Sequence, residues 1–127
     1  MNHSAFQRAS SAYGSAKQTL PPHKVVEALQ DRAVQLCMSA ERHARDGQFD
    51  RFHADIVHAI KIYTGLQVVM TNIVGGPSGK ALSQLYAAFI LALGRAAGGR
   101  DVPGRVRRIQ ERLSLHRRLW AKPPKAG

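Results

Sequence analysis

The sequence is poor in cysteine and in acidic residues. Its single cysteine, Cys37, cannot form a disulfide within the chain, and such sparse use of cysteine is typical of a reducing compartment. Eight Asp and Glu stand against 19 Lys and Arg, which gives a formal net charge of +11 over 127 residues. A basic excess of this size ordinarily indicates nucleic acid or an acidic membrane surface as the partner. The length is enough for one hydrophobic core without disulfides or metals.

Long apolar runs and a leader pattern are also missing. No stretch of about 18 apolar residues occurs, and the opening Met-Asn-His-Ser-Ala-Phe lacks the basic start and apolar run of a signal peptide. We therefore expect no membrane insertion and a cytoplasmic location.

Alternation of apolar and polar residues with a period of two is absent as well, so the sequence predicts no strand. Proline and glycine divide the chain into a short arm and four segments of helical length. Apolar residues recur every three or four positions in each segment, as they do in amphipathic helices. The expected core positions are Val26, Leu29, Ala33, Leu36 and Ala40; Phe52, Ile56, Ala59, Tyr63, Leu66, Met70 and Ile73; Leu82, Leu85, Phe89, Ala92 and Ala96; and Val106, Ile109, Leu113, His116 and Trp120.

The short connections between these segments favour antiparallel neighbours. The predicted fold is all-α, an antiparallel up-down four-helix bundle over residues 21–121. We expect residues 1–20 to form an N-terminal arm or short helix packing on it, and residues 122–127 to form a disordered basic tail. Gly47 is expected to end the first helix in the left-handed conformation, and Pro77 to open the third helix.

The second and third segments are apolar over more than one row, whereas a bundle helix needs only about three core positions in seven. The N-terminal arm, with Phe6 and Tyr13 as anchors, is one candidate to cover this surplus. A partner protein is another, and a broad bundle core is a third. The surplus residues are Val57, Ile60, Val68, Val69, Tyr86, Ile90, Leu91 and Leu93.

Patterns that carry chemistry are largely lacking. The six histidines contain no pair at the spacing that places two metal ligands on one helix face, so no metal is expected. The stretch from Gly75 to Lys80 resembles a phosphate-binding loop, but Val74 replaces its first glycine and Ala81 its Ser or Thr. Cys37 has no neighbouring base and is expected to be a buried structural thiol. The sequence predicts no catalytic residue, no cofactor and no enzyme.

The basic excess is concentrated at the end of the chain. Residues 101–127 hold eight Lys and Arg against Asp101 and Glu111, a net charge of +6. The cations surround the apolar row of the last segment and form no single basic face, so specific binding of nucleic acid is not favoured.

The order of these pieces is similar to that of the flagellin export chaperone family, FliS. In that family a tyrosine-bearing arm precedes a proline that opens a long first helix. A Gly-Gly break then leads to a Leu-Tyr pair in the third helix, and the last helix ends near a Trp. The likeness covers about residues 10–121, and the matching pieces are Ala12-Tyr13, Pro22 with Leu29 and Ala33, Asp46-Gly47-Gln48-Phe49, Gly75-Gly76, Leu82 with Leu85-Tyr86, and Leu119-Trp120.

The resemblance implies a chaperone of the bacterial cytosol, a monomer or weak homodimer. It would bind the disordered C-terminal region of flagellin, prevent premature polymerisation and deliver flagellin to the flagellar type III export apparatus, with an export-gate component as a further partner. Tyr13 is expected to act as a mobile plug, assisted by Phe6. The expected groove residues are Val57, Ile60, Thr64, Tyr86, Ile90 and Leu93, with ordinary core packing as the alternative for each.

Two other functions stay open. The basic last segment fits a nucleic-acid-binding regulator, for example of flagellin mRNA, whose binding falls steeply with salt. The surplus apolar face also fits a surface for homodimerisation.

Overall fold

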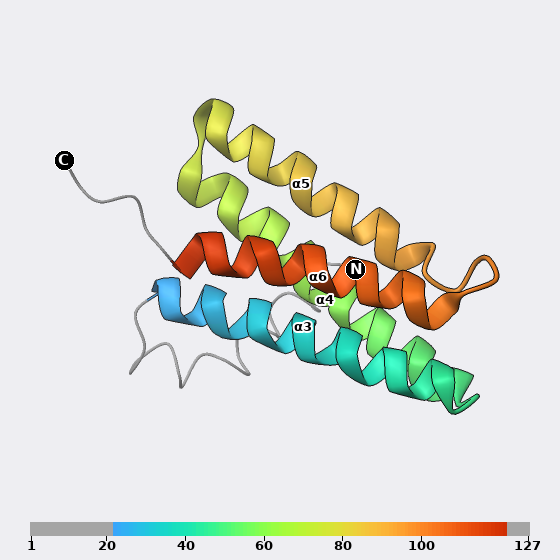
Figure 1. Ribbon diagram of the computed structural model, residues 1–127. Helices are drawn as coiled ribbons and strands as arrows, with labels where there is room; N and C mark the ends of the chain where they lie inside the picture. The colour runs from blue at the N-terminus through green and yellow to red at the C-terminus, as the bar shows by residue number, and fades with distance from the viewer. Residues whose placement is uncertain (1–21, 122–127) are drawn as a thin grey trace.

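The computed structural model describes residues 22–121, which form four helices and no strand. The helices are α3 (Pro22–Arg45), α4 (Phe49–Val74), α5 (Gly76–Gly94) and α6 (Val102–Ala121), as Figure 1 shows. The all-α four-helix bundle expected from the sequence is confirmed. The expected arm and tail, and with them Phe6 and Tyr13, lie outside the described residues.

The turns form where glycine and proline predicted them. Gly47 joins α3 to α4 with φ at 72°, a left-handed conformation that glycine adopts without a steric cost. Pro77 lies in the first turn of α5, as expected. The last helix starts one residue before Pro103, and the carboxylate of Asp101 accepts a hydrogen bond from the amide of Gly104 at 3.0 Å. That carboxylate caps an otherwise unpaired backbone donor.

Ion pairs show how α3 and α6 run relative to each other. Arg117 pairs with Asp31 in the first half of α3, and Arg107 pairs with Glu41 near its end. Residue numbers therefore rise on one helix as they fall on the other, so the two helices are antiparallel. α3 packs against both α4 and α6, α5 packs against α4, and α5 touches α6 only sparsely. In Figure 1, α5 diverges from α6 towards the α4–α5 turn.

The core draws side chains from all four helices. Its largest fully buried members include Tyr63, Tyr86 and Phe52. Most expected core positions are buried or half-buried, but Ile73 is 62% exposed and Leu85 is exposed too. Ile73 lies in the last turn of α4, beside the end of the bundle where α5 and α6 separate.

Cys37 is buried on the inward side of α3, as expected of a structural thiol. Burial, with a smaller contribution from the negative charge of Asp55, raises the pKa of this thiol to about 12. Within residues 22–121 no helix has the length and apolar character needed to cross a bilayer. Nor do these residues contain a group of three or more side chains suited to hold a metal ion.

Candidate partner-binding surfaces

Helix α5 is apolar on more sides than a bundle helix needs. It contains no Asp or Glu, and Lys80 is its only charged residue. One side packs into the core through Tyr86, Phe89 and Leu93. The side chains exposed after Lys80 are nonpolar apart from Gln84. A solvent-facing helix side normally carries charged residues, so this composition indicates a surface that something else covers.

The first apolar surface lies on the outer side of α4 and α5, and we call it the α4–α5 face. Gln67 ties the two helices together beneath it, because its side-chain amide donates to the carbonyl oxygen of Ser83 at 2.9 Å. Val57, Val68 and Leu91 are each about half exposed, at 48%, 51% and 54%. The face consists of Val57, Ile60, Thr64 and Val68 on α4, which recur at three- and four-residue spacing, and Ile90 and Leu91 on α5.

Thr64 does not interrupt the apolar character of this face. Its hydroxyl donates to the carbonyl oxygen of Ile60 at 2.8 Å, within the same helix. The hydroxyl is therefore satisfied without a partner molecule. Ile60 is half-buried and packs against the core, as does Ile90 on α5.

The structure brings together the expected groove residues Val57, Ile60, Thr64 and Ile90. It corrects the positions expected for Tyr86 and Leu93, which are 0% and 1% exposed and therefore line no surface groove. The reason is the phase of α5: Tyr86, Phe89 and Leu93 face inward, as does Ala96 beyond the helix end, while the expected core residue Leu85 faces outward. Val68 and Leu91 belong to the apolar surplus but were not among the expected groove residues.

The second apolar surface lies between α5 and α6, and we call it the α5–α6 seam. At the α4–α5 turn it opens into a shallow hollow of about 420 Å³. On α6, Leu115 and Leu119 beside it are 50% and 65% exposed. Sequence reasoning missed both leucines as surface candidates, although their four-residue spacing was visible. The hollow is lined by Val74, Ser78, Ala81, Leu82, Leu85 and Trp120.

A polar contact bridges the seam where α5 and α6 do meet. The hydroxyl of Tyr86 lies 2.9 Å from Nε2 of His116, and the side-chain amide of Gln30 donates weakly to the same hydroxyl at 3.4 Å. Burial lowers the pKa of His116 and raises the pKa of Tyr86 to about 12. At neutral pH the Tyr86 hydroxyl therefore keeps its proton and can donate it to an unprotonated His116. His116, expected at a core position, is half-buried and bonded to this hydroxyl.

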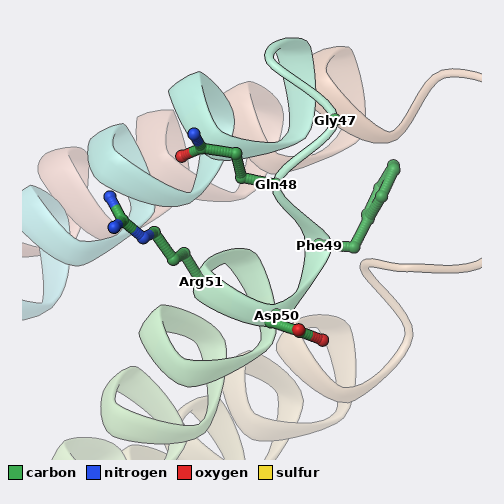
Figure 2. A pocket seen from close by; sticks show the side chains of 5 residues that line it. All are labelled: Gly47, Gln48, Phe49, Asp50 and Arg51. Carbon is green, nitrogen blue, oxygen red and sulfur yellow. The ribbon is translucent and has the colours of Figure 1, made fainter.

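Another hollow, also of about 420 Å³, lies at the α3–α4 turn. Figure 2 shows its side chains from Gly47 to Arg51, with Phe49 and Arg51 pointing in opposite directions. Because the polar groups do not converge on one point, this hollow has no arrangement suited to a small ligand.

The chain matches a known protein family. The family model described as Flagellar protein FliS matches residues 5–126. Comparison with curated proteins and with solved structures finds no significant match.

Proposed function

The chain belongs to the FliS family of flagellar proteins, and on that premise we propose that it is a cytoplasmic export chaperone for flagellin, without enzymatic activity. It binds the disordered C-terminal region of newly made flagellin and prevents premature polymerisation. It then delivers flagellin to the flagellar type III export apparatus, where an export-gate component is a further partner. The chaperone acts as a monomer or weak homodimer.

The observation that best supports this proposal is the α4–α5 face. Val57, Val68 and Leu91 leave about half of their apolar surface in water although they lie on one side of two packed helices. A disordered client can fold onto such a surface as an amphipathic helix. Burial of the client's apolar side chains then offsets the entropy that the client loses on ordering.

The charge distribution of α6 gives less support to a nucleic-acid-binding regulator. Arg107 and Arg117 are engaged with carboxylates of α3, so part of the basic excess is neutralised within the bundle. The two functions differ in their response to salt. Binding of an apolar client changes little with ionic strength, whereas binding of RNA weakens steeply.

Calorimetric titration of the full chain with a C-terminal flagellin fragment tests the proposal. We expect a one-to-one complex with a Kd below about 1 μM, equivalent to about −8 kcal/mol. Replacing Leu91→Gln should weaken binding about tenfold, which corresponds to 1.4 kcal/mol. The matched control is Met38→Gln, because Met38 is equally exposed on α3, outside the face. It should change affinity less than about twofold.

Thermal unfolding followed by circular dichroism shows whether each variant remains folded. Absence of binding by the folded wild-type chain would contradict the proposed function. Equal weakening by Leu91→Gln and Met38→Gln would place the client elsewhere on the bundle.

The N-terminal arm is a further part of the proposal. Tyr13, assisted by Phe6, occupies the groove until the client displaces it. Tyr13→Ala should therefore change client affinity while leaving the thermal unfolding midpoint almost unchanged. Parallel loss of affinity and stability would instead show that Tyr13 belongs to the core.

A further inference from the structure

The α5–α6 seam changes from cationic to apolar along its length. At the α5–α6 loop, a guanidinium nitrogen of Arg105 donates to the carbonyl oxygen of Arg95 at 3.2 Å, so Arg105 faces the end of α5. Further along α6, His116 contacts Tyr86 of α5. Arg112 lies seven residues after Arg105 and four before His116, which places it on the same side of the helix. Beyond His116, towards the end of α6, lies the apolar part of the seam with the hollow at the α4–α5 turn.

The cations of this side have no acidic partner within the described part of the chain. Arg108 and Arg112 are exposed and take part in no ion pair there. Helix α5 opposite them contains no carboxylate. Glu111 lies about 100° around α6 from Arg112 and forms no ion pair among residues 22–121. Asp101 lies one turn before Arg105, and its carboxylate caps the start of α6 at Gly104. The three arginines therefore leave the seam with a net positive charge.

The other end of the seam is apolar. The indole of Trp120 lines the hollow together with Leu82 and Leu85 of α5. Leu119, next to Trp120 in the chain, and Leu115, one turn earlier, are exposed on α6. Arg105 and Leu119 are 14 residues apart, a distance of about 21 Å along a helix. A single short segment can therefore span both parts.

We propose that the α5–α6 seam binds a segment of a separate polypeptide that is acidic at one end and apolar at the other. The carboxylates of that segment lie beside Arg105, Arg108 and Arg112, and its apolar side chains enter the hollow beside Leu119 and Trp120. The surface is distinct from the α4–α5 face, so this proposal stands whether or not flagellin binds there.

Charge complementarity selects this occupant over others. Residues 1–21 and 122–127 contain no Asp or Glu side chain, so neither end of this chain matches the cationic part. A second copy would bring the same arginines to the interface. Nucleic acid would match the arginines but leave Leu115 and Leu119 without an apolar partner, and a flat bilayer surface cannot fill a hollow between two helices.

Fluorescence polarisation with a labelled peptide tests the proposal on the full chain. The probe is an 18-residue peptide with glutamates in one half and leucines in the other, synthesised in both chain directions. A control peptide interleaves the same residues. We expect one of the two graded probes to bind at least about tenfold more tightly than the control. It should also shift the emission of Trp120, the only tryptophan of the sequence.

Two variants with the same change of charge locate the binding surface. Arg112→Glu should weaken binding of the graded probe about tenfold and flatten its dependence on salt. Arg118→Glu should weaken it less than about threefold, because Arg118 lies about 120° around the helix from Arg112. Both side chains are exposed and unpaired within residues 22–121, so both variants should fold.

Equal weakening by the two variants would overturn the proposal, because binding would then follow net charge alone. Equal affinity for the interleaved peptide would overturn it too. The proposal also falls if a single-stranded oligonucleotide or phosphatidylglycerol vesicles shift the Trp120 emission with the same dependence on Arg112.

Discussion

Helices α3 and α5 each pack against two neighbouring helices, but they do so through different kinds of contact. Both edges of α3 carry polar pairs: Arg117 forms an ion pair with Asp31 at 2.7 Å on the α6 side, and His43 forms a hydrogen bond with Asp55 at 2.8 Å on the α4 side. The edge of α5 towards α6 has no ion pair among the described residues and meets its neighbour mainly through aromatic rings. Polar pairs thus lie along both edges of α3, while α5 keeps exposed apolar side chains.

The largest loss of stability is expected when the aromatic contact between α5 and α6 is removed. Tyr86 is fully buried, and its ring packs against Tyr63, Phe89 and His116. Tyr86→Ala should lower the free energy of unfolding in urea by about 3–5 kcal/mol, as for other large aromatic truncations. Tyr86→Phe, which removes only the hydroxyl, should cost about 1–2 kcal/mol because Gln30 and His116 lose a partner.

A loss of less than about 1 kcal/mol for Tyr86→Ala would be far below the cost of truncating a core aromatic residue. It would mean that α5 does not unfold together with the core. The exposed apolar side chains of α5 would then be explained by a loosely packed helix and not by a binding surface.

A smaller effect should come from acidification at the same contact. Burial lowers the pKa of His116 below its ordinary value of 6.5, so the folded chain binds fewer protons than the unfolded chain. This contribution to stability is complete above pH 6.5 and is lost as pH falls through the lowered pKa. His116→Gln should reduce the difference in unfolding free energy between pH 7.5 and 5.5, measured in urea. An unchanged difference would contradict the assignment to His116.

Some dependence on pH should survive in that variant. The pKa of His58 is lowered as well, first by partial burial and then by the charges of Arg32 and Lys61. The double variant His58→Gln with His116→Gln should therefore show a smaller difference than His116→Gln alone.

The smallest effect is expected at the charged edge of α3. Arg117 is 20% exposed, but its partner Asp31 is 51% exposed, so solvent screens the pair. Arg117→Gln should lower stability by about 0.5–1 kcal/mol, and the loss should shrink in high salt. The neighbouring Arg118→Gln, which breaks no described pair, should change stability by less than about 0.5 kcal/mol. Equal losses of stability in the two variants would mean that the Arg117–Asp31 pair does not stabilise the packing of α3 against α6.

Much of the fold could be predicted because glycine and proline separate segments with clear apolar rows. The rows of α4 and α6 were largely predictable, since polar residues between apolar ones define the inward side. In α5 nearly every residue after Lys80 is apolar or small, so the sequence does not show which side of the helix faces the core. That is why Leu85 was expected inside and Tyr86 and Leu93 outside, the reverse of the structure.

The contacts between helices could not be predicted in the same way. Arg117 and Asp31 are separated by 86 positions, and only the packed bundle brings them together. Gln30 is buried against Tyr86, a position that its polarity gave no reason to expect. Leu115 and Leu119 were missed because they lie outside the apolar row of α6, in a segment rich in arginine.

The buried thiol of Cys37 has a practical consequence. With a pKa of about 12 and no exposed surface, it forms almost no thiolate at neutral pH and is shielded from reagents while the chain is folded. The native protein therefore reacts with maleimides as if it contained no cysteine. A cysteine introduced at Leu91 or Leu119 would be the single labelled position, which allows a dye or spin label to report separately on each apolar surface.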